Sequence, residues 1–216
     1  GIICDVDKCN GCYSCFLACK DEHLGNDYPP ISVSQSEGQK WINVKEIEQG
    51  TGSKIKVDYI PIMCQHCENP PCMRLAQEGA VYKRDDGIVI IDPEKAVGCR
   101  EIVDTCPYGC IEWNESLKLP QKCTMCAHML DNGEKTTRCV EVCPTGALVF
   151  GDLDDPESEI CKVIAENKDK LETFMPQYGV TTTVKYLNLP KVFICGELVY
   201  SDTDECAEGV KVTLTC

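Results

Sequence analysis

Cysteine is the residue that most constrains what this chain can fold into. Nineteen of its 216 residues are cysteine, and many of them stand in C-x-x-C runs. Disulfide bonds, zinc sites and iron–sulfur clusters are the three frameworks that commonly explain such a density. A secreted disulfide scaffold is usually shorter, and zinc does not account for four thiols within the eleven residues 9–19. The pattern therefore favours iron–sulfur clusters in a reducing compartment.

The cysteines fall into four groups, two complete and two with gaps. The first is Cys9, Cys12, Cys15 and Cys19, and the last is Cys123, Cys126, Cys139 and Cys143, which Pro144 follows. The second is Cys64, Cys67 and Cys72, with Ala76 where a ferredoxin-type run would place its fourth cysteine. The third should read C-x2-C-x2-C-x3-C-P, but it carries Ala96, Cys99, Ile102, Cys106 and Pro107.

Crossed ligation explains the gaps. In ferredoxin-type pairs, three thiolates of one short loop bind one cubane, and the fourth cysteine of the run ligates the other cluster. The second group then takes Cys106 and forms a complete set. Its partner cluster would need positions 76, 96, 99 and 102, of which only Cys99 is a cysteine. We call these four positions the lost site, because one whole cluster is missing there while its neighbour is kept.

We therefore predict three [4Fe–4S] clusters held by twelve cysteines. The predicted ligands are Cys9, Cys12, Cys15 and Cys143 at site 1; Cys123, Cys126, Cys139 and Cys19 at site 2; and Cys64, Cys67, Cys72 and Cys106 at site 3. A [3Fe–4S] form or zinc is the alternative.

The other cysteines are expected to be small buried apolar residues; they are Cys4, Cys99, Cys110, Cys161, Cys195, Cys206 and Cys216. His66 and His128 lie in or beside C-x-x-C pairs, where a hydrogen bond to a cluster, a structural role or a partner contact would each suit them. His23 carries no signal of its own.

The order of patterns along the chain predicts an α+β fold. Residues 1–152 are expected to form a double ferredoxin-like iron–sulfur domain, with a cysteine-free insert of about 21–60 that forms a loop and a hairpin over the cluster core. Residues 153–185 are expected to be a helical connector. Residues 186–216 are expected to be the start of a β-sandwich module.

Local signals place the elements. Asp85-Asp86-Gly87 between two apolar runs predicts a hairpin over 80–91. Asp155 and Pro156 suit the start of a helix over 155–175. Residues 192–200 and 210–215 have strand patterns around a polar turn at 201–205.

The chain is strongly acidic, with a formal net charge of −14. Thiolate-bound [4Fe–4S] clusters would add negative charge, so nucleic acid and anionic membrane surfaces are poor partners. A solvated surface and docking to a basic partner both fit this charge. No stretch approaches the roughly 20 apolar residues of a membrane span, and no signal peptide is visible, so we expect a cytoplasmic protein. No nucleophile–base pair or phosphate-binding glycine loop is present, so we expect no catalytic residue in this chain.

The paired modules with a long insert resemble the iron–sulfur subunits of the dimethyl sulfoxide reductase (molybdopterin oxidoreductase) family. The supporting stretches are KDEH at 20–23, WIN at 41–43, CQHCEN at 64–69, DGIVIIDPEKA at 86–96 and KCTMCAH at 122–128. Within that family the chain is most similar to the small subunits of transhydroxylases and catechol dehydroxylases. The similarity implies a three-cluster subunit that ends in a transthyretin-like β module.

The resemblance also implies the partner. This is a large catalytic subunit that holds molybdenum or tungsten on two pyranopterin guanine dinucleotides and transfers or removes aromatic hydroxyls. Electron transfer to that subunit is the first hypothesis for this chain. There are two alternatives. In the first, the complex catalyses a transhydroxylation without net redox change, and the clusters mainly stabilise the fold. In the second, the chain is a free-standing polyferredoxin carrier. In four-cluster relatives the third-group cluster is the one farthest from the pterin. Its loss would remove the exit for electrons toward a membrane quinone subunit, so we predict a complex without such a subunit.

Overall fold

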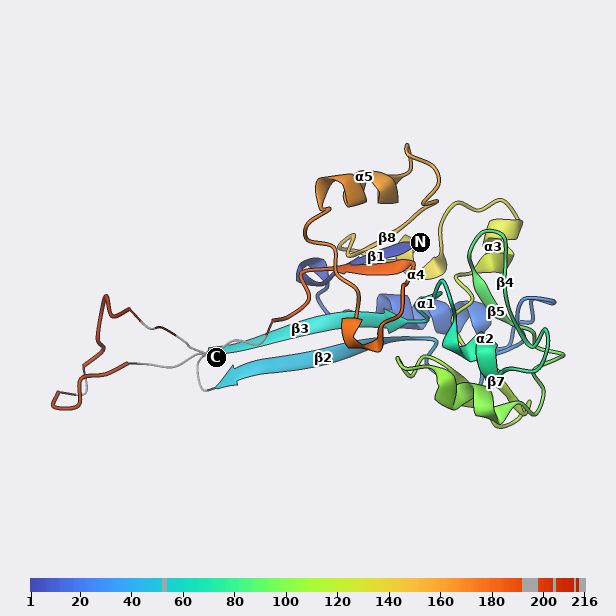
Figure 1. Ribbon diagram of the computed structural model, residues 1–216, viewed down its shortest axis with the longest axis horizontal. Helices are drawn as coiled ribbons and strands as arrows, with labels where there is room; N and C mark the ends of the chain where they lie inside the picture. Colours follow the sequence, from blue (N-terminus) through green and yellow to red (C-terminus); the bar gives the residue numbers. More distant parts are fainter. Residues whose placement is uncertain (52–53, 192–197, 204, 212, 214–216) are drawn as a thin grey trace.

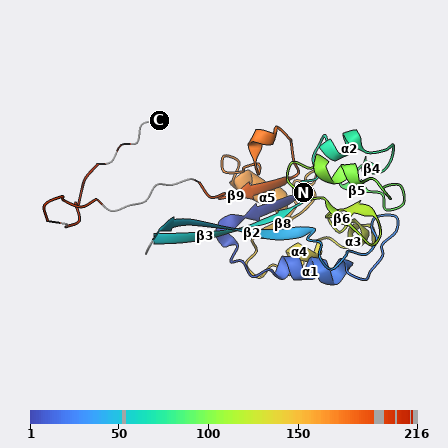
Figure 2. The same cartoon turned by 90° about the horizontal axis from the view of Figure 1, so that it is seen from below.

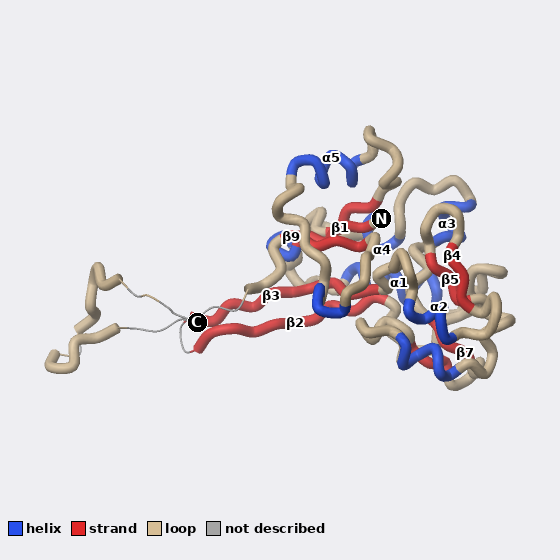
Figure 3. The backbone as a smooth tube through the Cα atoms, in the orientation of Figure 1, coloured by secondary structure: helices blue, strands red, loops and turns tan. Residues whose placement is uncertain are grey.

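The computed structural model describes residues 1–51, 54–191, 198–203, 205–211 and 213. Its longest elements form one hairpin, which projects from a body of short helices, short strands and loops (Figures 1 and 3). This mixture agrees with the predicted α+β class. None of the helices in the described ranges is long and apolar enough to cross a membrane.

The elements are short because the chain turns repeatedly around its cysteine groups. The helices are α1 (Ser14–His23), α2 (Pro71–Leu75), α3 (Ala127–Asp131), α4 (Arg138–Glu141) and α5 (Glu159–Glu166), with 3-10 turns at Val6–Lys8, Arg100–Thr105 and Pro176–Tyr178. The strands are β1 (Ile2–Asp5), β2 (Ile42–Thr51), β3 (Lys54–Met63), β4 (Val81–Lys83), β5 (Val89–Ile91), β6 (Glu112–Asn114), β7 (Leu119–Gln121), β8 (Leu148–Phe150) and β9 (Val184–Leu187).

The hairpin of the insert is formed by β2 and β3. The strands pair antiparallel, with Ile42 opposite Met63 at the end near the body. Both of these side chains are buried in the main core, whereas residues 54–57 at the far end are exposed. The predicted hairpin is confirmed, but only its near half covers the core, and the rest extends as an arm (Figures 1 and 2). The far half carries too many charged residues to be buried.

A three-stranded sheet, which the sequence reasoning missed, ties residues near position 1 to residues 148–187. β1 lies at its centre, antiparallel to β8 and parallel to β9. Strand side chains alternate between faces: Ile3 and Leu187 pack against Ile160 of α5, whereas Ile2 and Cys4 belong to the main core. The boundary expected between residues 185 and 186 therefore falls inside β9. The division of the chain into domains stays a prediction.

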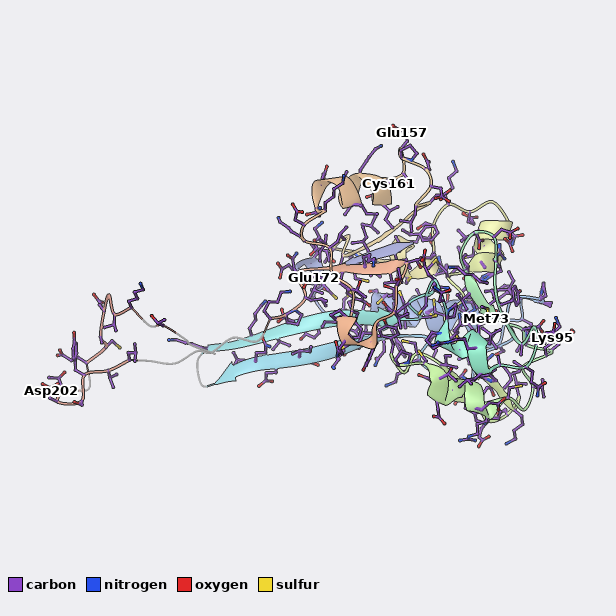
Figure 4. The ribbon with its side chains drawn as sticks, viewed as in Figure 1. Met73, Lys95, Glu157, Cys161, Glu172 and Asp202 are labelled. Atoms are coloured by element: carbon purple, nitrogen blue, oxygen red, sulfur yellow. The ribbon has the colours of Figure 1, made fainter. Side chains whose placement is uncertain are left out.

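Helix α5 is shorter than the predicted helix over 155–175. Its N-cap is Ser158, whose Oγ accepts a hydrogen bond from the Cys161 N–H over 3.4 Å. Asp155 instead accepts from the Glu157 N–H one turn earlier, over 2.9 Å. Such a local turn competes with helix, so the first residues of the predicted helix remain outside it. Cys161 lies on α5 at the edge of the body (Figure 4).

The hairpin predicted over 80–91 is confirmed. Val81 of β4 pairs with Ile91 of β5, and the Arg84 N–H donates to the Ile88 carbonyl. Gly87 has φ of 80°, a left-handed conformation that suits glycine in the turn.

The C-terminal stretch contains a small turn where the sequence predicted the start of a β module. Val199 forms an isolated antiparallel bridge with Cys206, and residues 201–203 of the predicted turn are in a turn. Figure 4 places Asp202 of this turn far from the body.

The two strands predicted for this stretch fare differently. Residues 210, 211 and 213 of the second predicted strand are not in a strand. Residues 192–197 of the first, and 212 and 214–215 of the second, lie outside the described residues. A transthyretin-like module is therefore not found in the described part of the chain, where Leu198, Val199 and Tyr200 are exposed.

Candidate iron–sulfur centres

Site 2 has its four cysteines around one cavity. Cys19 comes from α1, Cys123 and Cys126 from the loop that leads into α3, and Cys139 from α4. The sheet, the hairpin and the helices supply the rest of the lining: Ile2, His23, Ile42, Met63, Thr124, Met125, Thr137 and Arg138. The structure thus brings Cys19 to three cysteines of the distant last group, as crossed ligation requires.

Site 3 also surrounds a cavity with four cysteines. Cys64 and Cys67 lie in the loop after β3, Cys72 lies on α2, and Cys106 follows the 3-10 turn of Arg100–Thr105. The other lining residues are Gln65, Pro70, Pro71, Val89, Pro107, Tyr108, Ile111 and Lys122. Cys106 therefore joins the second group.

Site 1 is the most exposed of the three sets. Cys12 is exposed, Cys9 and Cys143 are half-buried, and Cys15 on α1 is buried. Burial raises the pKa of the Cys9 thiol, and the charges of Cys143 and Cys12 raise it further, so these three thiols are neighbours. The four predicted ligands of site 1 thus gather where the loop after β1 meets the end of α4.

Three of the C-x-x-C loops turn in the same way. The residue just before the second cysteine has a positive φ in the loops that end at Cys12, Cys67 and Cys126: Gly11 at 70°, His66 at 42° and Met125 at 54°. Alternating backbone handedness points successive N–H groups to one side, which forms an anion-binding concavity. Histidine and methionine rarely adopt this conformation, so their presence there indicates that the surrounding site imposes it.

Backbone N–H groups donate to the cysteine sulfurs. The donor lies two residues after the cysteine for Cys64 and Cys123, over 3.5 and 3.3 Å. Cys106 accepts from the Cys110 N–H over 3.5 Å. These donors suit sulfur that carries negative charge.

Two side chains within hydrogen-bond distance of cysteine sulfurs at site 2 were missed in the sequence. Gln35 Nε2 donates to Cys19 Sγ over 3.7 Å, and Thr137 Oγ1 lies 3.3 Å from Cys139 Sγ. Gln35 comes from the insert, where no spacing signal relates it to a cysteine. Thr137 lies two residues before its cysteine, which is a signal that could have been used.

The arrangement of the thiols suits the positively charged core of an iron–sulfur cluster better than a single metal ion. Burial and, after it, the charges of Cys64, Cys106 and Cys72 together raise the pKa of Cys67 to about 12. Four mutually repelling thiolates need positive charge between them, which an iron cubane supplies. Zinc needs its thiolates about 2.3 Å from one ion, yet no three Cys, His, Asp or Glu residues of the described chain could hold one metal ion together. The cysteines present therefore fit [4Fe–4S] clusters better than zinc.

The lost site is filled by an apolar cluster. Ala96, Cys99 and Ile102 are buried in it, and Ala76 packs against it. All four positions that a fourth cluster would need thus belong to, or pack against, one apolar cluster of side chains. The Cys99 Sγ lies 3.8 Å from the Lys95 carbonyl oxygen.

The other cysteines outside the sites mostly behave as expected. All 17 described cysteines are free thiols. Cys4, Cys99 and Cys110 are buried, whereas Cys161 is half-buried and Cys206 is exposed. Cys195 and Cys216 lie outside the described residues.

The three histidines differ in their partners. His66 is buried, and its Nδ1 accepts from the Val89 N–H over 3.1 Å. The ring of His128 stacks on Tyr28, and its Nε2 lies 3.0 Å from Glu22 Oε1. His23, which the sequence did not single out, lines the site 2 cavity.

The three sites lie in series. Burial is the main cause that raises the pKa of Cys15 at site 1 to about 12, and the charge of Cys139 at site 2 is the next. Burial raises the pKa of Cys123 at site 2, and the charge of Cys64 at site 3 contributes to the rise. Site 2 therefore neighbours both of the others.

These thiol sites in ferredoxin-like loops define an iron–sulfur protein of the [4Fe–4S] type. Residues 55–153 match the model of the 4Fe-4S dicluster domain. The chain is 42% identical to the pyrogallol hydroxytransferase small subunit of Pelobacter acidigallici, over 99% of this chain and 77% of that one. It is 32% identical to a tetrathionate reductase subunit of Salmonella typhimurium (89% and 74% covered) and 35% identical to a polysulfide reductase chain of Wolinella succinogenes (88% and 93% covered).

The chain is a member of the iron–sulfur subunits of the dimethyl sulfoxide reductase (molybdopterin oxidoreductase) family. The resemblance inferred from the cysteine code and the KCTMCAH stretch is therefore confirmed, as is the similarity to a small subunit of a hydroxytransferase.

Proposed function

We propose that this chain is an electron-transfer subunit with three [4Fe–4S] clusters, which serves a large molybdopterin subunit that transfers or removes aromatic hydroxyls. The observation that carries the proposal is the series of three thiol sites beside a fourth that is closed by apolar side chains. The twelve proposed ligands are those predicted from the sequence for sites 1, 2 and 3. No residue of this chain is proposed to be catalytic, and the active site is expected on the partner.

The serial arrangement favours electron transfer. Site 2 neighbours both site 1 and site 3, so an electron has a continuous route along the three sites. Clusters that only stapled a scaffold would not need to lie side by side. The cysteines of sites 2 and 3 are buried or half-buried, and Ile42 and Met63 of the β2–β3 hairpin line site 2. Burial of this kind limits reorganisation and side reactions when charge moves.

Site 1 is the proposed point of exchange with the large subunit. Cys12 is exposed, and Leu17 on the adjacent helix is 62% exposed. Tyr13 beside it is also exposed. An exposed apolar surface next to a cofactor site suits a permanent protein contact.

The hydroxyl chemistry is proposed from similarity. A relative that is 42% identical to this chain over nearly its whole length is named as the small subunit of a pyrogallol hydroxytransferase. The corresponding partner here would hold molybdenum or tungsten on two pyranopterin guanine dinucleotides and bind a phenol with adjacent hydroxyls. A cytoplasmic location and the absence of a membrane quinone subunit stay predictions.

Iron and acid-labile sulfide analysis of the purified complex tests the cluster number, once the iron of the large subunit is subtracted. Roughly twelve irons per small subunit are expected for three cubanes. An iron content of about sixteen per small subunit would contradict the crossed pairing. A content of about eight would mean that one of the three sites holds no cluster.

Electron transfer has its own test. The complex is reduced stepwise with dithionite and followed by electron paramagnetic resonance, and is then frozen during turnover with a phenolic substrate. Signals that change during turnover support electron transfer. Clusters that stay silent throughout would instead favour a structural role. A stable small subunit that purifies without any large chain would favour a free-standing carrier.

A further inference from the structure

Lys122 is a buried cation at the junction of two cluster sites. Its side chain is 2% exposed, and it lines the site 3 cavity. The next residue along the chain is Cys123, a proposed ligand of site 2. Lysine is almost never buried to this degree unless it is paired with an anion.

The partners of Lys122 in the described chain are neutral. Its Nζ donates to the Val89 carbonyl and, over 3.1 Å, to the Cys123 carbonyl. No carboxylate of the described residues forms an ion pair with it. An ammonium has three N–H donors, so one donor is left for a further acceptor. A buried charge without a counter-charge is strongly unfavourable, so an anion is required nearby.

Backbone contacts fix the ammonium in place. Val89 on β5 accepts from Lys122 through its carbonyl and donates through its N–H to His66 Nδ1 over 3.1 Å. His66 lies between Cys64 and Cys67 of site 3. One residue of β5 thus connects Lys122 to a cysteine loop of site 3, so the lysine is held by the same framework as the cluster ligands.

The cavity that Lys122 lines is the one that holds the proposed cluster ligands. Cys64, Cys67, Cys72 and Cys106 line it together with Lys122. A cubane with four thiolates is an anion, and one-electron reduction makes it more negative without requiring a proton. The anion that Lys122 lacks among the side chains is therefore available in the site 3 cavity.

We propose that Lys122 is the counter-ion of the site 3 cluster and raises its reduction potential, so that the cluster takes up one electron more readily. This inference rests on the proposed function, because it requires a cluster at site 3. A purely structural lysine that ties two carbonyls is the competing explanation.

A redox titration of the purified complex, followed by electron paramagnetic resonance, separates the two explanations. Lys122→Gln keeps two N–H donors for the carbonyls but removes the charge. Lys122→Arg keeps the charge. The matched control is Lys20→Gln, since Lys20 also neighbours a site 2 ligand, Cys19, but its Nζ donates to the Ser36 carbonyl over 2.8 Å and it does not line site 3. Cys106→Ser identifies the site 3 signal.

Lys122→Gln is expected to decrease the ratio of reduced to oxidised site 3 cluster at a fixed potential at least tenfold, about 59 mV for one electron. Lys122→Arg and Lys20→Gln should leave that ratio within threefold of the unmodified complex. Loss of the site 3 cluster in Lys122→Gln, with retention in Lys122→Arg, also supports a counter-ion.

Two results would overturn the proposal. One is an unchanged site 3 ratio in Lys122→Gln with all clusters present. The other is loss of the cluster in both Lys122 variants, which would assign the effect to side-chain shape. A failure of the proposed function is distinct from these, because the unmodified complex would then have no site 3 signal at all.

Discussion

Site 3 and the lost site are neighbours that derive from the same two cysteine groups, and they have opposite interiors. Site 3 keeps four cysteines around a cavity, and a buried lysine lines that cavity. The lost site has Ala96 and Ile102 where cysteines would be needed, and these side chains are packed at 0% exposure. The comparison shows that neighbouring parts of this backbone hold either a cysteine-lined cavity with a buried cation or a packed apolar interior.

An interior with only two or three cysteines, between a full ligand set and an apolar filling, would be unfavourable. Two or three thiols without a full ligand set would leave either an incomplete cluster or polar groups in an apolar interior. Crossed ligation explains why the chain avoids this, since three of the four ligands of one cluster are replaced while those of the neighbour are retained. Cys99 remains because a thiol also packs as a small apolar side chain.

Removal of a proposed site 3 ligand is expected to have the largest effect. Cys106→Ala leaves three thiols at site 3, so the iron content should fall from roughly twelve to about eight per small subunit. Cys99→Ala is the matched control, because Cys99 belongs to the same cysteine group but lies in the lost site. It should leave the iron content unchanged. Iron loss in Cys99→Ala, with none in Cys106→Ala, would reverse the assignment of the two sites.

Restoration of the lost site tests the comparison from the other side. Ala76→Cys, Ala96→Cys and Ile102→Cys together with Cys99 provide the four thiols that crossed ligation requires. Because the four positions already lie in one cluster of side chains, anaerobic reconstitution is expected to raise the iron content to about sixteen. An iron content that stays near twelve would mean that the apolar packing has moved the loop out of reach of a cubane.

The packing of the lost site should contribute to stability as an ordinary core does. Ile102→Ala removes a fully buried side chain and is expected to lower the free energy of unfolding by about 2–5 kcal/mol. Val97→Ala, at a position that is 55% exposed, should change it by less than about 0.5 kcal/mol. Anaerobic urea titrations followed by circular dichroism compare the two. Equal effects would indicate that the lost site is not a packed core.

The same contrast explains what the sequence could predict. The cysteine spacing grouped the four cysteines that line each of the cavities of sites 2 and 3, because cluster ligation imposes fixed spacings along the chain. The Asp-Gly turn at residue 87 was found because its signal is local. Both kinds of signal are independent of long-range packing.

The features that were missed depend on packing between distant segments. Strands β1 and β9 are four residues each and pair across the chain, so no local pattern announces their sheet. The start of α5 was placed too early because Asp155 forms a local turn in place of a helix cap. Lys122 was noticed only as part of a family-like stretch, since burial without a carboxylate cannot be read from sequence order.

The smallest expected effect concerns the thiol that remains in the lost site. Cys99→Ala removes one buried heavy atom from the apolar cluster, so it should lower the free energy of unfolding by about 0.5–1.5 kcal/mol, well below the change for Ile102→Ala. Cys99→Val nearly conserves the apolar volume, and such a swap should cost less than about 1.5 kcal/mol. The same anaerobic urea titration measures both variants, with the iron content as a check that all clusters are retained. If Cys99→Ala destabilised the chain as strongly as Ile102→Ala, Cys99 would have a role beyond packing, and the lost site would no longer be the apolar counterpart of site 3.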